Sequence, residues 1–257
     1  MVRQTFRPNF LSDIAIMFSA CFMNKVSVSY LLTACMCLFS TYVSAQETFV
    51  WIKDKDQVIE AGGWMLQGQK VKYWKSYYSD ETLKSEGRYD KNIQTGSWKT
   101  YSENGKISSS GNYTSGQKDG YWKTYHANGE VKAEGSYTMG IRTGWWKTYL
   151  DNGVLSALGQ YASGKQNDYW KIFFPNGKIQ SEGYFKNGQK TDWWRNYDSL
   201  GKLESEGSFY KDKKDGLWKF YSQNALVEEG SFYDNSKVGT WKKYDSTGVL
   251  IQVIDHD

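Results

Sequence analysis

Aromatic and aliphatic residues recur along this chain with a period of 24 residues, and polar residues fill the positions between them. Each period is marked by a tryptophan with short apolar–polar alternations on either side. The tryptophans that keep this spacing are Trp74, Trp98, Trp122, Trp146, Trp170, Trp194 and Trp218, with Trp241 following after 23 residues. Alternation of this kind predicts β-strands, and a fixed period of this size is typical of repeat proteins.

The positions between the tryptophans are also shared, and we count them from each tryptophan. A cation follows at +1, an aromatic residue at +3, an aliphatic residue at +9, a glycine at +13 and a second aromatic residue at +15. In the first copy these are Lys75, Tyr77, Leu83, Gly87 and Tyr89. Glutamate is frequent at +12. In the seventh copy the glycine and the second aromatic residue come one residue early.

Two turn signals divide each unit into two strands. The first carries glycine at +7, mostly after asparagine, as in Asn104-Gly105. Leu200-Gly201 and Pro175 before Asn176 fit a type I turn followed by a left-handed glycine, which makes a three-residue loop. The second turn has Gly, Asn or Asp at +18, and we expect it to behave alike. Each unit is therefore predicted to be a β-hairpin.

The loop length decides which residues share a face of the sheet. Three-residue loops place Tyr at +3, the aliphatic residue, Gly at +13 and the aromatic residue at +15 on one face, with Trp and Glu on the other. A two-residue first loop would instead place Trp opposite Gly at +13 and Lys at +1 opposite Glu at +12. The turn residues favour the first register. The predicted fold is an all-β, elongated antiparallel meander of about eight 24-residue hairpin repeats, in a twisted or curled single sheet.

The first 45 residues differ from the repeats and are predicted to be a signal-peptide region. A start at Met23, Lys25 and the apolar stretch 26–39 precede small residues that fit cleavage after Ala45. A transmembrane anchor is a weaker interpretation because the apolar run is short and interrupted by polar residues. A lipobox ending at Cys35, with a lipid on that cysteine, is a minor alternative. We expect residues 46–72 to be a degenerate N-terminal cap repeat headed by Trp51, and 73–257 to be the repeat domain.

Composition limits the classes of function. The 32 Lys and Arg residues nearly balance the 28 Asp and Glu residues, which is too little positive charge for a dedicated nucleic-acid binder. Two prolines, 25 glycines and 17% aromatic residues favour strands and turns over disorder. All three cysteines lie before residue 46, so the chain after the leader has no disulfide.

The unit G-x-W-[KR]-x-Y-x-x-N-G-x-[ILV]-x-x-x-G-x-[YF]-x-x-G is similar to the MORN repeat in its bacterial variant form. The resemblance runs from about Tyr73 to the C-terminus, with a worn copy from Trp51. It implies a stack of hairpins without a catalytic centre, used for binding proteins or membranes. Bacterial members of the variant are described as antitoxin-like. An exported copy departs from that picture, because a classical antitoxin meets its toxin in the cytoplasm.

The aromatic row is the candidate binding surface. Tryptophans that line an open trough could stack on sugars or hold a quaternary ammonium group, whereas buried ones would form the core of the sheet. Two acidic residues replace the glycine found two positions before tryptophan, and they mark either a functional patch or neutral drift. The candidate residues are Trp98, Trp122, Trp145, Trp146, Trp170, Trp193, Trp194, Asp168 and Asp192.

No catalytic, metal or cofactor site is expected. His126 and His256 lack partners for a triad, and no His/Cys cluster suggests zinc. The glutamates at +12 could resemble a glycosidase pair, but their recurrence favours pairing with the lysine row. The glycines lack the strand–loop–helix context of a phosphate site.

The predicted function is a non-catalytic, exported scaffold that binds a protein partner or a cell-envelope surface. The periplasm, the envelope or the medium is its expected location. We expect no nucleic-acid partner, no small-molecule ligand and no integral membrane domain in the mature chain. The alternative is a carbohydrate- or choline-binding cell-wall module that uses the Trp and Tyr rows.

Overall fold

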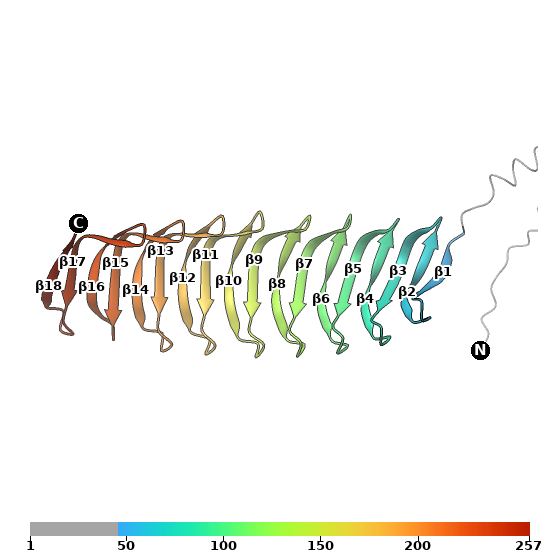
Figure 1. Ribbon diagram of the computed structural model, residues 1–257, viewed down its shortest axis with the longest axis horizontal. Helices are drawn as coiled ribbons and strands as arrows, with labels where there is room; N and C mark the ends of the chain where they lie inside the picture. Colours follow the sequence, from blue (N-terminus) through green and yellow to red (C-terminus); the bar gives the residue numbers. More distant parts are fainter. Residues whose placement is uncertain (1–45) are drawn as a thin grey trace, which may run out of the picture. The chain divides into compact units, whose positions relative to one another are not determined.

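The computed structural model describes residues 46–257, in which residues 48–257 form one unit built from a single antiparallel sheet (Figure 1). Within this range 18 strands pair in chain order, each with its sequence neighbours, from β1 to β18. No helix among the described residues has the length and hydrophobicity needed to span a bilayer. The predicted leader, its cleavage after Ala45 and lipidation at Cys35 lie outside the described residues.

Odd-numbered strands from β3 onward carry the tryptophans, and even-numbered strands from β4 to β16 carry the glycines at +13, or at +12 in β16. The strands are β1 (Thr48–Lys53), β2 (Ile59–Leu66), β3 (Gln69–Tyr77), β4 (Leu83–Asp90), β5 (Ile93–Tyr101), β6 (Ile107–Thr114), β7 (Gln117–Tyr125), β8 (Val131–Thr138), β9 (Ile141–Tyr149), β10 (Leu155–Ala162), β11 (Lys165–Phe173), β12 (Ile179–Lys186), β13 (Gln189–Tyr197), β14 (Leu203–Tyr210), β15 (Lys213–Ser222), β16 (Ala225–Tyr233), β17 (Ser236–Tyr244) and β18 (Leu250–His256).

The meander of hairpin repeats is confirmed. Eight hairpins, from β3–β4 to β17–β18, follow the tryptophan period, and the hairpin β1–β2 precedes them. Trp51 of β1 lies opposite Gly62, which in turn lies opposite Lys75. It therefore lies on the face that carries the lysines, whereas Trp74 lies on the other face.

The first turn has the predicted form in every unit except the seventh. In the second copy the Gly105 N–H donates to the Ser102 carbonyl at 2.8 Å, and the Ser102 N–H donates to the Lys106 carbonyl at 2.9 Å. Gly105 has a φ of 76°. This is a type I turn closed by a left-handed glycine, with three residues in the loop.

The second turn differs from the first, and the expectation that both turns have the same form was wrong. Thr114 pairs directly with Gln117, and the two residues between them, Ser115 and Gly116, have φ of 50° and 78°. Two consecutive positive φ values define a two-residue type I′ turn, whose twist matches that of the flanking strands. The first turn of the seventh copy, at Gln223 and Asn224, is of this kind too, which explains why that copy is one residue shorter.

The favoured register was wrong beyond the first turn. Tyr101 pairs with Ile107 as expected, but Thr100 pairs with Ser109, so one extra residue bulges from β6. The bulge shifts the pairing by one residue, and each such shift moves all following side chains to the other face. Trp98 consequently lies opposite Gly111. The alternative register predicted this pairing of Trp with Gly at +13 from a two-residue loop, whereas the structure reaches it through a three-residue loop and a bulge.

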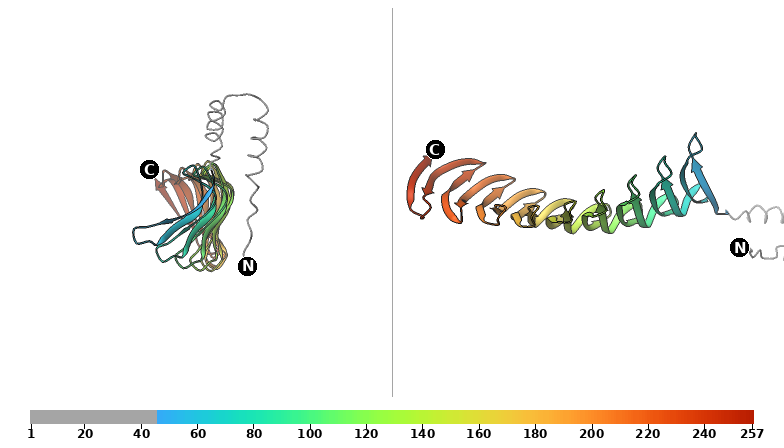
Figure 2. Two further views of the ribbon diagram at one scale, coloured as in Figure 1. Left: turned by 90° about the vertical axis from the view of Figure 1, so that its right-hand side faces the viewer. Right: turned by 90° about the horizontal axis from the view of Figure 1, so that it is seen from below.

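The sheet in residues 48–257 twists along its length, and its strands are bent (Figure 2). Right-handed strand twist accumulates from one hairpin to the next, as expected for a long meander. The turns line up in two rows along the edges (Figure 1). Because each hairpin contacts only its neighbours, one unit of sequence produces the same local surface many times.

Candidate binding surface

The two faces of the sheet have different compositions. The tryptophan face carries Trp at position 0, Gly at +13 and the aromatic residue at +15, as the pairing of Trp98 with Gly111 and of Gly96 with Tyr113 shows. The lysine face carries Lys at +1, Tyr at +3, Glu at +12 and the residue just before each tryptophan. Lys123 lies opposite Glu134 on this face.

Tryptophans form the buried core of the tryptophan face. From Trp74 to Trp241, all eight are at most 4% exposed. From Trp98 onward each packs edge-to-face against the ring at +15 of its own repeat and the matching ring of the preceding repeat, and Trp74 packs against Tyr89 alone, with ring centroids 5.0 to 6.3 Å apart. The rows interlock into one aromatic ladder along the sheet. Such T-shaped contacts contribute beyond the burial of apolar area.

A glycine lies under each indole and makes this close packing possible. A Cβ atom on Gly135 would lie 2.4 Å from the ring of Trp146. The indole N–H also donates to a backbone carbonyl of the same neighbouring strand, as Trp146 does to Ser136 at 3.1 Å. The equivalent bond exists for every tryptophan in the row.

Cations cover the outer side of most of these indoles. The residue four positions before the tryptophan places its charge 3.8 to 4.5 Å from the ring centroid in six copies. Burial against the aromatic rings lowers the pKa of Lys190, one of these cations. Trp98 and Trp170 instead follow Gln94 and Gln166. The indoles of the tryptophan face are therefore buried in the core. The accessible aromatic rings of the repeats lie on the lysine face.

The candidate residues divide between the two faces. Trp98, Trp122, Trp146, Trp170 and Trp194 belong to the buried ladder of the tryptophan face.

The additional tryptophans of the candidate set point away from the ladder. Trp145 and Trp193, each just before a ladder tryptophan, lie on the lysine face and are 56% and 36% exposed. The structure therefore does not bring the nine residues together into one patch.

Asp168 and Asp192 have a local backbone role. Their φ values are 60° and 53°, and glycine holds the same left-handed position in most other copies, as at Gly144. The backbone bulges here just before each tryptophan. Aspartate is one of the few residues that tolerate this conformation, so both residues suit the bulge without any ligand.

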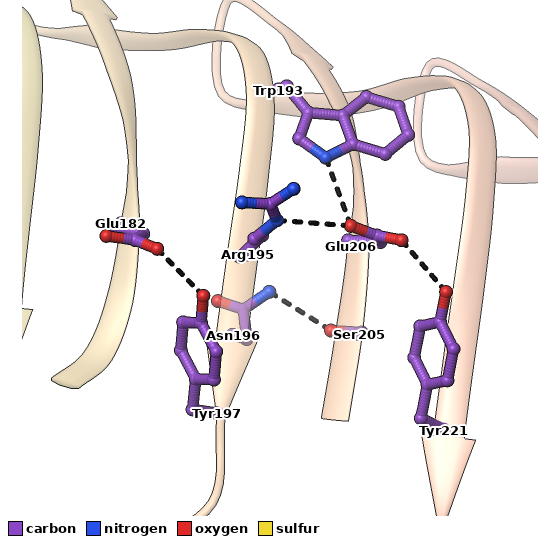
Figure 3. Close-up of polar contacts among 8 residues, drawn as sticks. All are labelled: Glu182, Trp193, Arg195, Asn196, Tyr197, Ser205, Glu206 and Tyr221. Atoms are coloured by element: carbon purple, nitrogen blue, oxygen red, sulfur yellow. Dashed lines mark hydrogen bonds and ion pairs between the residues drawn. The ribbon is translucent and has the colours of Figure 1, made fainter. Parts of the chain in front are cut away.

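Glutamates on the lysine face join neighbouring repeats. The Tyr197 hydroxyl donates to Glu182 at 2.7 Å, and the Tyr221 hydroxyl donates to Glu206 at 2.8 Å (Figure 3). Arg195 pairs with Glu206 at 3.2 Å.

The same arrangement recurs along the sheet. Tyrosine hydroxyls donate to glutamates at 2.6 to 2.8 Å in three further copies, namely Tyr101 to Glu86, Tyr149 to Glu134 and Tyr244 to Glu229. Three lysines pair with the same row, Lys75 with Glu86, Lys123 with Glu134 and Lys171 with Glu182, at 3.2 to 3.8 Å. Carboxylates held in this way act as bridges within the sheet.

These bridges shift the acidity of both partners. Burial, and after it the hydrogen bond to Glu134, together raise the pKa of Tyr149 to about 12. Burial also opposes ionisation of Glu134, but Tyr149, Tyr121 and Lys123 outweigh it, so its pKa lies below the ordinary value. Glu134 is therefore an anion near neutral pH, and both tyrosines keep their protons.

The residue before each tryptophan forms an exposed row on the lysine face. We call Tyr121, Trp145, Tyr169 and Trp193 the central ring row. Tyr121 is 52% exposed, and Tyr184 packs against Tyr169 with centroids 5.1 Å apart.

Most rings of this row approach the glutamate of their own repeat. Trp193 donates its indole N–H to Glu206 at 3.3 Å. Burial raises the pKa values of Tyr121 and Tyr169, and the nearby carboxylates of Glu134 and Glu182 add to the rise. The position that Glu206 holds is taken by Leu158 in the repeat of Trp145. The ring of Trp145 thus has no carboxylate in the position from which Glu206 accepts the Trp193 indole N–H.

The two histidines have structural contacts and form no site on this surface. His126 bonds through Nε2 to the Tyr149 carbonyl at 2.9 Å, and the His256 ring packs against Trp241. In the part of the chain that the structure describes, no three His, Cys, Asp or Glu side chains gather as metal ligands would.

Sequence reasoning missed the bond between Tyr at +3 and Glu at +12, because it placed them on opposite faces. The signal was present in the joint spacing: Tyr101 and Glu86 are 15 residues apart, and this separation recurs in five copies. Trp145 and Trp193 were among the candidate residues, but the face on which they lie depended on the register.

Three segments of the chain, residues 94–114, 118–138 and 169–187, match the model of the family described as the MORN repeat variant. These three segments are MORN-variant repeats. The matched segments fall on β5–β6, β7–β8 and β11–β12, and the other hairpins from β3 to β18 repeat the same pairing of strands. MORN repeats are generally binding or scaffold modules and typically lack catalysis.

No curated protein matches the chain. Among solved structures, a mutant of S. aureus TarM in complex with Fondaparinux, alpha-GlcNAc-glycerol and UDP shares 9% identity, with a TM-score of 0.26. The match covers 63% of this chain and 32% of TarM, so this chain spans about a third of that protein. The TCP10 domain of Danio rerio CPAP in complex with a STIL peptide shares 12% identity and has a TM-score of 0.24, covering 82% of this chain and 100% of that domain.

Proposed function

We propose that this MORN-repeat protein is a non-catalytic scaffold that binds a protein partner through its lysine face. The observation that carries the proposal is the difference between the two faces. The tryptophans of the tryptophan face are buried in the core, whereas the lysine face presents Tyr121, Trp145 and Trp193 to solvent beside a row of cations. Exposed aromatic residues flanked by charges are typical of interaction surfaces.

The predicted leader supports a partner at the cell envelope. Export would carry the mature chain to the periplasm, the envelope or the medium, where its lack of cysteines is no disadvantage. It would also separate the chain from a cytoplasmic toxin, which argues against a classical antitoxin role. Cell fractionation with an antibody to the mature chain tests this location.

A carbohydrate-binding role is the second candidate, and the exposed ring row favours it. Rings on alternate strands could stack on successive sugars of a glycan. The fixed charges beside each ring favour the protein partner, because the surface offers cations and carboxylates together with rings.

Capture of a partner tests the proposed function. We would immobilise the full chain, the double variant Tyr121→Ala/Trp193→Ala, and the control Tyr210→Ala/Tyr233→Ala. The control removes two exposed rings next to turns, outside the central ring row. A protein that the wild type and the control retain, that the double variant loses, and that binds again when purified supports the proposal. A partner that the double variant retains equally would contradict it.

A further inference from the structure

The central ring row has a regular spacing that can be compared with extended ligands. Its rings occur on β7, β9, β11 and β13, so neighbouring rings are two strands apart. Strands in a sheet lie ~4.8 Å apart, which sets the rings at intervals of ~10 Å. The row stays in line because each ladder tryptophan faces the next across one glycine, as Trp122 and Trp146 do across Gly135.

A polyproline II helix has the matching period. It has three residues per turn and rises ~3.1 Å per residue, which gives ~9.3 Å per turn. One ring would therefore meet each turn of a ligand that crosses the strands. Such helices bind to aromatic-lined surfaces, and their backbone carbonyls are free to accept hydrogen bonds.

Trp145 is the ring best suited to anchor this ligand. It is 56% exposed, and its indole N–H donates to no other group within residues 46–257. Half-buried Leu158 holds the place that Glu206 holds beside Trp193, where the carboxylate accepts the indole N–H. The Trp145 indole N–H is thus left free for a ligand carbonyl beside an apolar floor.

Charge at this point adds a preference for acidic residues in the ligand. Leu158 lies between Lys147 and Lys171 on the neighbouring strands. Lys171 pairs with Glu182. Lys147 lies opposite Glu134, but that carboxylate pairs with Lys123, and Lys147 forms no ion pair of its own within the described part of the chain. The site therefore offers one unpaired cation next to the free indole N–H.

We infer that the central ring row binds a proline-rich segment with acidic residues, in the polyproline II conformation, centred on Trp145 and Leu158. The inference rests on the proposed function and names the chemistry of the partner. The chain has two prolines, Pro8 and Pro175, so the segment comes from another protein.

Fluorescence anisotropy tests the inference with a defined probe. The full chain would be titrated against a labelled peptide of four Pro-Pro-Glu units and against four Gly-Gly-Glu units of equal charge. We expect saturable binding of the first peptide and at least about tenfold weaker binding of the second, since the flexible peptide must be ordered on binding.

Two variants locate the site, and a third is the control. Trp145→Ala removes the anchor. Leu158→Glu restores the residue that other repeats carry, which occupies the indole N–H and repels the acidic ligand without harm to the fold. Each should weaken the proline-rich peptide by at least about tenfold, as loss of an aromatic hot spot does. Tyr210→Ala should leave its affinity unchanged.

Other outcomes overturn the inference. Equal binding of the two peptides would contradict the inference, and so would an unchanged affinity of Leu158→Glu for the proline-rich peptide. Tighter binding of a β-1,4-linked hexasaccharide of N-acetylglucosamine, lost in Trp145→Ala, would assign the row to glycans. If the peptides fail while capture of a partner still depends on Tyr121 and Trp193, the inference is wrong and the proposed function stands.

Discussion

Glycine at +13 and the tryptophan of the next repeat form the smallest packing unit of this protein. The indole of Trp146 lies on Gly135 and donates its N–H to the following carbonyl, that of Ser136. Glycine is needed because any Cβ would overlap the ring. The sequence pattern Gly-x₁₀-Trp thus encodes a packing contact between neighbouring hairpins. This glycine is required by the indole above it and not by a turn.

Gly135→Ala should destabilise the fold. The new methyl group would start 2.4 Å from the Trp146 ring, so strand or indole must move. We expect the free energy of unfolding to fall by about 1–3 kcal/mol, the usual cost of overpacking. Urea denaturation followed by tryptophan fluorescence measures it.

Ser136→Ala, the next residue of the same strand, is the matched control and should change stability by less than about 0.5 kcal/mol. Trp146→Phe combined with Gly135→Ala should recover part of the loss, because the smaller ring leaves room. A Gly135→Ala variant as stable as the wild type would refute the packing unit.

The bond between Tyr149 and Glu134 should make stability depend on pH at both extremes. Folded Tyr149 has its pKa raised to about 12 by burial and by Glu134, while an unfolded tyrosine ionises near ~10. This contribution is complete below pH ~10 and is lost as pH rises toward 12. The lowered pKa of Glu134 works in the opposite sense, so its contribution is present above pH ~4.3 and is lost on acidification.

Tyr149→Phe tests this bond, and Tyr125→Phe is its control. Tyr125 holds the equivalent position but lies within 3.4 Å of Ser110 instead of a carboxylate. At pH 7 we expect a loss of about 1 kcal/mol for Tyr149→Phe and a smaller loss for the control. Above pH 11 the difference between Tyr149→Phe and the wild type should shrink. Parallel stability curves for these two proteins up to pH 12 would count against the assignment.

At the scale of the element, each 24-residue unit is a hairpin tied to the next by its turns as well as its strands. Asn104 holds its own turn through the Lys106 N–H at 3.1 Å, and its amide donates to the Ala127 carbonyl of the next turn at 3.1 Å. Asn128 repeats the link to Asp151. The unit therefore carries all the groups it needs to join an identical neighbour.

In-frame deletion of residues 120–143 should leave a folded, shorter protein. It joins Asp119 to Gly144 and so keeps the sequence of strands and turns in phase. Circular dichroism and limited proteolysis should show an intact sheet of lower total stability. Deletion of residues 120–131, half a unit, should instead disrupt the sheet, because it removes one strand and breaks the alternation. Equal loss of structure in both variants would contradict the modular fold.

At the scale of the whole sheet, stability is a sum over neighbouring hairpins, and within residues 46–257 the two edge strands have one neighbour each. β1 pairs with β2, and β18 pairs with β17. In β18 the position of the glycine is taken by Ile254, opposite Trp241. Its side chain would obstruct a further indole, so the ladder ends there.

Hydrogen exchange should report this gradient. We expect amides of β7 to β13 to be the most protected, with protection decreasing toward β1 and toward β18, because fraying begins at the ends of a linear array. Mass spectrometry of peptic fragments resolves the strands. Uniform protection from end to end would indicate that the sheet unfolds as one cooperative unit, and would contradict a stability that is a sum over neighbouring hairpins.

Much of this protein was accessible from its sequence, because a repeated pattern reports the same local chemistry many times. The period, the hairpins, the three-residue turn at Asn104-Gly105 and the MORN resemblance all follow from residue types at fixed spacing. Local propensity and turn geometry decide these features within a few residues of chain. The type I′ form of the second turn was not recognised, because Met139 at a positive φ is unfavourable by itself.

The assignment of faces was decided only by the tertiary structure. A bulge of one residue at Ser108 in β6 turns Gly111 to the face of Trp98 and Ser110 to the face of Lys99, the reverse of what the loop length alone implies. Local sequence scarcely distinguishes the two registers, since both alternate correctly. The choice is made by the neighbouring strand, where a glycine accepts the indole and a carbonyl accepts its N–H. With the tryptophans placed in the core, Trp145 and its neighbours became the exposed row that the proposed function uses.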